Sequence, residues 1–240
     1  MENFFSSSPA QNFEIFSASH LMAVSFAILA AVFLFIAKNR FRDSLPLFQA
    51  LRWGLFAVLI TCELSYHIWA VSVDIWSFRG YMPFHLSSIG AITAIIGLFT
   101  LNRTWVQISF FIGVVPAFLT LLTPDLRYDY DHLRFWIFFL QHIAILLASL
   151  FLALHRPHLI TFRSVGGVYL LLLLYAAFVG FIINPALDSN FMYLADRPGS
   201  DTMLDYFGEG FTYYLSLSLT ALAVFLVQFF LWSKFIIKKE

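Results

Sequence analysis

Six polar side chains of types that perform catalysis or bind ligands lie inside otherwise apolar stretches of the sequence. They are Glu63, His67, His85, Ser87, Gln141 and His142. Glu63 and His67 are four residues apart, so on a helix their side chains share one face and can touch. His85 and Ser87 follow Pro83 at the start of another apolar stretch. Ionisable side chains are costly inside an apolar helix and usually mark a functional path.

One hypothesis for this combination of a hydroxyl, histidines and a carboxylate is an enzyme of acyl transfer or hydrolysis that acts on lipid. In that hypothesis Ser87 is the nucleophile, His85 or His142 is its general base, and Glu63 orients a histidine. Cys62, the only cysteine, is the alternative nucleophile. The amide of Gln141 or Asn190 would donate a hydrogen bond to the oxyanion. Four residues are expected to contact the ligand: His67, Gln141, Asn190 and Tyr193.

Three other hypotheses use the same side chains. His67, His85 and His142 would hold zinc, with Glu63 as general base, because three histidines and a water form a known catalytic arrangement. No HExxH motif supports zinc, and no other cofactor is predicted. A non-enzymatic protein would bind or transport a small molecule or lipid, with Glu63 and His67 sensing protons or holding a cationic group. In a structural protein, these polar groups would only form hydrogen bonds with one another.

The composition indicates that membrane-spanning helices position these side chains. Of the 240 residues, 60% are hydrophobic and 12% are charged, whereas soluble domains average roughly 45–50% and about 25%. The formal net charge of zero offers no basic patch for nucleic acid. Membrane lipids, and a small-molecule or lipid ligand arriving from the outer side, are therefore the expected partners.

Seven apolar stretches have about the length that a bilayer requires, roughly 20 residues each. They predict an all-α membrane protein, a single polytopic domain over residues 1–240 that forms a seven-helix bundle. The predicted helices span residues 18–37, 47–72, 81–101, 104–123, 135–154, 165–184 and 211–232. The connection over residues 185–210 is too apolar for a solvated linker, and we expect it to fold back as a cap over the mouth of the bundle.

Basic residues predict the orientation of this bundle, because Lys and Arg are retained on the cytoplasmic side. With the N-terminus outside and the C-terminus in the cytoplasm, ten Lys and Arg residues fall on the inner side and four on the outer side. The four outer residues are Arg79, Arg127, Arg134 and Arg197. This distribution predicts a multi-pass protein of the cell membrane.

Depth brings the candidate site residues together. Measured from the outer end of its predicted helix at 1.5 Å per residue, Glu63 lies ~13 Å deep, His67 ~7 Å, His85 ~6 Å and His142 ~11 Å. All four therefore fall in the outer half of the membrane. The pattern predicts a polar cavity that opens to the outside and is lined by these residues and Ser87.

Three short motifs resemble those of the YwaF-type family of bacterial integral membrane proteins. The first is Pro83-Phe84-His85-Leu86-Ser87, at the start of the third predicted helix. The second is His142 within the fifth predicted helix, and the third is Asn190-Phe191-Met192-Tyr193-Leu194 after the sixth. Together with the seven-helix layout, the resemblance extends over most of the chain.

This resemblance implies a lipid-modifying activity. Distant eukaryotic relatives of the family, in the transmembrane-protein series, are lipid acyltransferases that use a cysteine and a histidine, which implies His85 or His142 as the base. The sequence departs from that pattern at the nucleophile, because Phe84 or Ser87 stands where a thiol is expected. A serine in this role needs a base and an oxyanion site to activate its hydroxyl.

Overall fold

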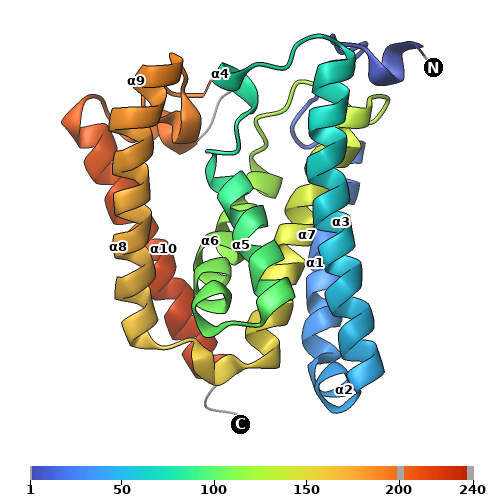
Figure 1. Ribbon diagram of the computed structural model, residues 1–240, viewed down its shortest axis with the longest axis vertical. Helices are drawn as coiled ribbons and strands as arrows, with labels where there is room; N and C mark the ends of the chain where they lie inside the picture. Colours follow the sequence, from blue (N-terminus) through green and yellow to red (C-terminus); the bar gives the residue numbers. More distant parts are fainter. Residues whose placement is uncertain (1, 199–202, 237–240) are drawn as a thin grey trace.

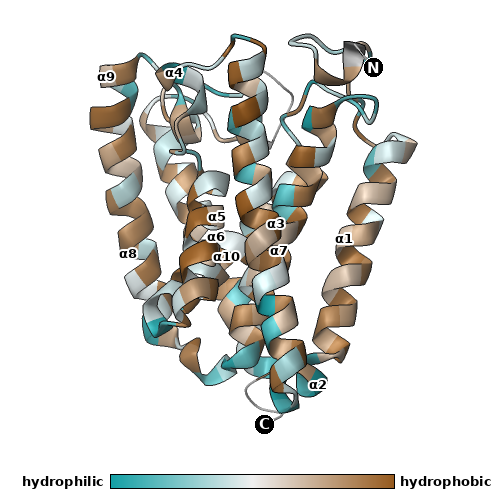
Figure 2. Ribbon diagram, turned by 45° about the vertical axis from the view of Figure 1, so that its right-hand side comes forward, coloured by the Kyte–Doolittle hydropathy of each residue, from teal (hydrophilic) through white to brown (hydrophobic). Residues whose placement is uncertain are grey.

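The computed structural model describes residues 2–198 and 203–236, and all regular secondary structure in these ranges is helical. Six helices are long and apolar enough to cross a membrane: α1 (Ala18–Ile36), α3 (Leu45–Ser72), α6 (Arg103–Leu122), α7 (Leu133–His155), α8 with its continuation (Phe162–Leu187) and α10 (Phe211–Phe235). Hydrophobic residues predominate along them, whereas hydrophilic residues gather at the ends of the bundle (Figure 2). The chain is a multi-pass membrane protein.

The helix α7 forms the centre of the bundle. In its most apolar window 78% of the residues are buried, against 17–50% in the other candidate spans. It packs against α1, α3, α5 (Leu86–Thr100) and α6, while α8 and α10 pack on each other and on α6 (Figure 1). Buried residues extend around most of α7, although Trp136 and Leu140 are exposed on its outer side.

The bundle has an upper and a lower end. The upper end in Figure 1 holds the starts of α1 and α7 and the end of α3. The lower end holds the short helix α2 (Lys38–Asp43), the end of α7, the 3-10 turn Pro157–Leu159 and the start of α8. The N-terminal segment crosses the upper end, where the Phe13 N–H donates to the Arg127 carbonyl over 3.0 Å. His132 Nε2 donates to the Ser6 carbonyl over 2.9 Å in the same region.

The third predicted helix differs most from the structure. The segment predicted at 81–101 divides into α4 (Phe78–Tyr81), an extended stretch, and α5, which has only 15 residues. Pro83 explains the break, because a proline disfavours helical geometry at the preceding residue and Met82 is extended. At about 22 Å, α5 is shorter than a bilayer core. The described residues thus contain six candidate spans and this shorter apolar helix, instead of seven of full length.

Side chains form hydrogen bonds with backbone groups at the lower end of α5 and just beyond the continuation of α8. Arg52 on α3 donates to the carbonyls of Leu98 and Phe99, which have no N–H donor within the last turn of α5. The sixth predicted helix extends to Phe162–Leu187 through a π-helical turn (Val179–Ile183) and α9 (Asn184–Leu187). Buried Asn184 donates to the Phe191 carbonyl and accepts from the Phe191 N–H, at 3.1 and 2.9 Å.

Small residues permit close packing of α6 against α7. A Cβ atom added to Gly113 would lie 2.1 Å from Ser149 Oγ and 3.0 Å from Ser149 Cβ. The Ser149 hydroxyl also forms a buried hydrogen bond of 2.8 Å with the Ser109 hydroxyl. Small side chains and buried hydroxyl pairs are typical of helix contacts in membranes, where backbones must approach closely to gain van der Waals contact.

Candidate functional site

The start of α5 lies below the upper ends of α3 and α8 (Figure 1). His85 occupies the N-cap position, but its side chain makes no capping hydrogen bond. Among the described residues, the N–H groups of Leu86, Ser87 and Ser88 donate to no acceptor. The first turn of a helix carries a partial positive charge and free donors, so it is suited to stabilise an oxyanion. Ser87 lies within this turn.

His142 on α7 is a buried base. Its side chain is 4% exposed, and Nδ1 lies 2.7 Å from the Phe138 carbonyl oxygen. A carbonyl only accepts hydrogen bonds, so Nδ1 carries the proton and Nε2 presents a lone pair. Nε2 is buried and has no hydrogen-bond partner in the described part of the chain. An imidazole held in this tautomer can take a proton from a neighbouring hydroxyl.

The packing of α5 on α7 places Ser87 level with His142. A Cβ atom on Gly90 would lie 3.4 Å from Ile145, and one on Gly97 would lie 2.8 Å from Leu152. Both contacts join residues 55 positions apart, and both helices run from the upper to the lower end. The same offset pairs Ser87 with His142, one turn above the contact of Gly90 with Ile145.

A hydrogen-bonded group on α3 adjoins this level. Glu63 Oε2 accepts from Gln141 Nε2 over 2.7 Å, and Glu63 Oε1 lies 3.4 Å from His67 Nε2. His67 Nδ1 in turn accepts from Trp76 Nε1 over 3.1 Å. The interaction with Gln141 connects α3 to the residue directly before His142. The group is half-buried, with Glu63 and His67 side chains 23% and 29% exposed.

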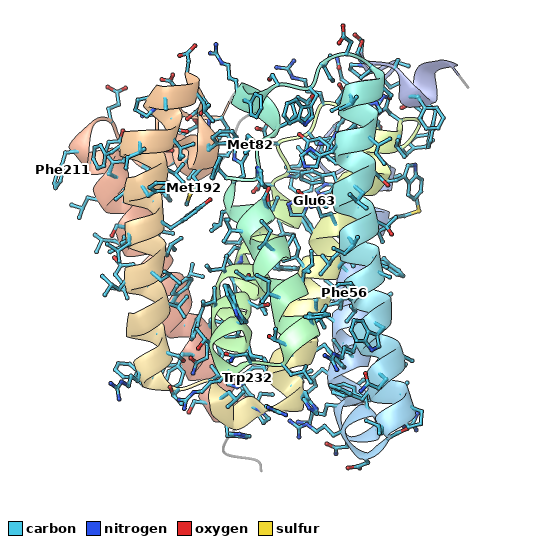
Figure 3. All side chains as sticks on the ribbon, viewed as in Figure 1. Phe56, Glu63, Met82, Met192, Phe211 and Trp232 are labelled. Atoms are coloured by element: carbon cyan, nitrogen blue, oxygen red, sulfur yellow. The ribbon has the colours of Figure 1, made fainter. Side chains whose placement is uncertain are left out.

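The segment after α9 folds back over the start of α5. The Met192 N–H donates to His85 Nδ1 over 3.3 Å, and the Tyr193 hydroxyl donates to Asp125 over 2.7 Å. Met192 and Tyr193 both have positive φ angles, 58° and 54°. Consecutive non-glycine residues in this region are strained and persist only where surrounding contacts hold them. Figure 3 shows Met192 and Glu63 at similar height on either side of the start of α5.

The contacts of Tyr193 and Asn190 show how this segment is ordered. Burial, together with the Asp125 carboxylate, raises the pKa of Tyr193, so its hydroxyl remains a hydrogen-bond donor. Asn190 Nδ2 donates to the Asp196 carbonyl over 2.7 Å, while Oδ1 accepts from the N–H groups of Ala195 and Asp196. Asn190 thus shapes its own loop, and its side-chain amide is engaged there.

A cleft of about 380 Å³ opens at the upper end, and Asn190 is the predicted site residue that lines it. Arg79 and Asp188 also line the cleft and form an ion pair of 2.6 Å. Both side chains are mostly exposed, so the pair contributes little to stability. The predicted cap over 185–210 is described here except for residues 199–202, which lie outside the described ranges.

Sequence reasoning missed the environment of Arg134. Its guanidinium carbon lies 4.1 Å from the ring centroid of Tyr66 and 5.4 Å from that of Trp69. Such contacts stabilise a cation on aromatic faces. The available signal was an arginine in the first turn of a long apolar helix, but the rings come from α3 and are distant in sequence.

The remaining candidates are separated from one another. Cys62 is buried at 2% exposure beside Glu63 on α3. His67 contacts Glu63 and Trp76, His85 accepts a hydrogen bond from Met192, and His142 bonds to the Phe138 carbonyl. Within the described residues no group of three or more His, Cys, Asp or Glu side chains is arranged to hold a metal ion. The structure therefore brings Glu63 into direct contact with His67 and Gln141, and places Ser87 level with His142 without a hydrogen bond between them.

Comparison with known proteins gives one match. The model described as the TMEM164 family matches residues 15–229, a range that includes every predicted site residue. Neither a curated protein nor a solved structure matches the chain.

Proposed function

Because the chain belongs to the TMEM164 family, we propose that it is an intramembrane lipid acyltransferase or hydrolase whose active site lies at the start of α5. The observation that carries this proposal is the buried Nε2 of His142, which has no partner among the described residues and is level with Ser87. The acyl-transfer activity implied by the sequence resemblance also supports it.

The proposed reaction begins when Ser87 Oγ attacks the carbonyl carbon of a lipid ester. His142 Nε2 accepts the hydroxyl proton and passes it to the departing alcohol oxygen, leaving an acyl-serine and a lysolipid. The free N–H groups of Ser87 and Ser88 stabilise the oxyanion. Water, or the hydroxyl of a second lipid, then attacks the acyl group and gives its proton to His142, which returns it to Ser87 Oγ.

Other residues have supporting roles in this proposal. Glu63 orients His67 and Gln141, which border the site on the α3 side. His85 holds the Met192 segment over the site through its Nδ1 atom. The orientation proposed is that of the sequence prediction, with the upper end outside, because the lower end carries most of the basic residues. The site would then act on lipid of the outer leaflet of a bacterial plasma membrane.

A non-enzymatic role is the second candidate, and the Glu63 and His67 pair favours it. A carboxylate and an imidazole 3.4 Å apart and partly exposed can bind a proton or a cationic ligand without chemical reaction. In this role the protein would bind or transport a small molecule or lipid.

The test uses the full-length protein in phospholipid nanodiscs, with release and transfer of a labelled acyl chain as the readout. Ser87→Ala and His142→Gln are expected to lower turnover by roughly 10²-fold or more. Ser88→Ala, on the same turn, keeps the backbone N–H that the proposed reaction uses and removes only a hydroxyl that the reaction does not use, so it is the matched control and retains activity. A fluorophosphonate probe labels the wild type and Ser88→Ala, but not Ser87→Ala.

Three results would refute the proposal. Undiminished turnover or labelling in Ser87→Ala eliminates Ser87 as nucleophile, and loss of turnover in Cys62→Ser alone assigns that role to Cys62. If the wild type has no turnover but binds a ligand in a manner abolished by Glu63→Gln, the binding or transport role replaces the enzymatic one.

A further inference from the structure

A second cleft lies at the lower end of the bundle, between the starts of α6 and α8. Its volume is about 490 Å³, within the range of roughly 300–1,000 Å³ that is usual for ligand sites. The starts of α6 and α8, whose residues line the cleft, are at the opposite end of the bundle from the start of α5 (Figure 1). The proposed acyl-transfer reaction uses none of the residues that line it.

The mouth of this cleft is basic. Arg103 is the first residue of α6 and Arg163 the second residue of α8, and both line the cleft with exposed side chains. Neither arginine forms an ion pair with any described residue, and no Asp or Glu lines the cleft. The hydroxyl-bearing residues Thr104 and Thr161 lie beside them. An anionic group is therefore the complementary ligand, and two guanidinium groups suit a phosphate.

The floor of the cleft is apolar and extends toward the middle of the membrane. Ile108, Val168 and Leu171 line it, at five to eight residues beyond Arg103 or Arg163 along their helices. At 1.5 Å per residue, the floor reaches roughly 7–12 Å beyond the arginines. A Cβ atom added to Gly167 would meet nothing within 4 Å, so the wall of the cleft is open at this position.

A basic mouth at the membrane surface and an apolar floor beneath it together match an amphiphile. We propose that this cleft binds one anionic phospholipid, with its phosphate between Arg103 and Arg163 and an acyl chain along Ile108 and Leu171. The charge complementarity selects an anionic headgroup, and the depth of the apolar floor selects a lipid over a soluble phosphate. This site is independent of the acyl-transfer proposal, because it lies at the other end of the bundle.

The experiment measures lipid retention by native mass spectrometry of the delipidated full-length protein. Phosphatidylglycerol and phosphatidylcholine with identical chains are added in equal amounts, and glycerol phosphate serves as a soluble competitor. The wild type is expected to retain one phosphatidylglycerol in preference to phosphatidylcholine. Arg103→Gln and Arg163→Gln should each lower that preference about fivefold, and the double variant about 25-fold.

Two matched controls separate the site from general surface attraction. Arg40→Gln removes an exposed arginine of α2 at the same end of the bundle but outside the cleft, and should retain the preference. Gly167→Leu should block retention of both lipids, whereas Gly54→Leu on α3 should not. The two variants are matched, because a Cβ atom added at either glycine meets nothing within 4 Å.

Three results would overturn the proposal. They are an unchanged preference in the arginine double variant, an equal loss in Arg40→Gln, and competition by glycerol phosphate as effective as that by the lipid. The first two would assign the preference to diffuse charge, and the third would assign the cleft to a soluble phosphate. Lysolipid production by the same samples reports separately on the site at α5.

Discussion

Replacing Gly113 by alanine tests the close packing of α6 against α7 on which the position of His142 depends. The added methyl would lie 2.1 Å from Ser149 Oγ, well inside the ~3.5 Å at which nonbonded atoms normally rest. Rotating the Ser149 hydroxyl away would break its bond to Ser109 and still leave Ser149 Cβ at 3.0 Å. The substitution therefore forces the helices to separate or the hydrogen bond to break.

The magnitude follows from three contributions. Overpacking costs about 1–3 kcal/mol, and loss of a buried hydrogen bond costs about 0.5–1.5 kcal/mol. Replacing a helical glycine by alanine returns about 1 kcal/mol. We expect Gly113→Ala to lower the free energy of unfolding by about 1–3 kcal/mol. Gly54→Ala is the matched control, because nothing lies within 4 Å of its added Cβ, and it should raise the same quantity by up to about 1 kcal/mol.

The assay is reversible unfolding in mixed micelles with increasing SDS, followed by the fluorescence of the six tryptophans. In a Ser149→Gly background the contacts with Ser149 are absent and the contact with Ile145 Cγ2, at 3.3 Å, is left. Gly113→Ala should therefore cost much less there than in the wild type, which a double-mutant cycle measures. Equal stability of Gly113→Ala and Gly54→Ala, or an unchanged penalty in the Ser149→Gly background, would refute this account of the packing.

Two further predictions concern the ends of the bundle. Arg52→Met should speed amide exchange in the last turn of α5, because the Leu98 and Phe99 carbonyls lose their donors; Arg40→Met, which removes an exposed arginine of α2, should leave that exchange as in the wild type. Burial lowers the pKa of His132, which binds the N-terminal segment, below 6.5. When this segment detaches, His132 is exposed and takes up a proton more readily, so attachment of the segment weakens as the pH falls through 6.5. The amide hydrogen exchange rate of residues 4–13, corrected for the intrinsic effect of pH, should therefore rise in the wild type when the pH is lowered from 7.5 to 5.5. A rise of equal size in His132→Asn would contradict this role for His132.

Apolar runs were sufficient to predict most of the helices, because a segment of about 20 apolar residues has few alternatives to a membrane span. The helices α1, α3, α6, α7, α8 and α10 begin and end within a few residues of the predicted bounds. The prediction failed at Tyr81–His85, where the composition remains apolar but Pro83 imposes extended geometry. Local backbone chemistry, which hydropathy does not register, decided that boundary.

The candidate site was predictable only as far as spacing within one helix reaches. The interval between Glu63 and His67 predicted their contact, which the structure shows at 3.4 Å. The bond from Gln141 to Glu63 and the stacking of Arg134 on Tyr66 depend on how α7 packs against α3. The packing between two helices is set by the shapes of the side chains along the whole length of both, so no local sequence pattern predicts it.

The length of α5 has a consequence for the membrane around the protein. A helix of about 22 Å is shorter than a hydrocarbon core of ~30 Å, and such hydrophobic mismatch is relieved by local thinning of the bilayer or by polar groups that descend into it. At the upper end, the deficit lies where His85 and Ser87 begin the helix. In the proposed reaction, such thinning would shorten the distance that a lipid headgroup near α5 must move to reach Ser87.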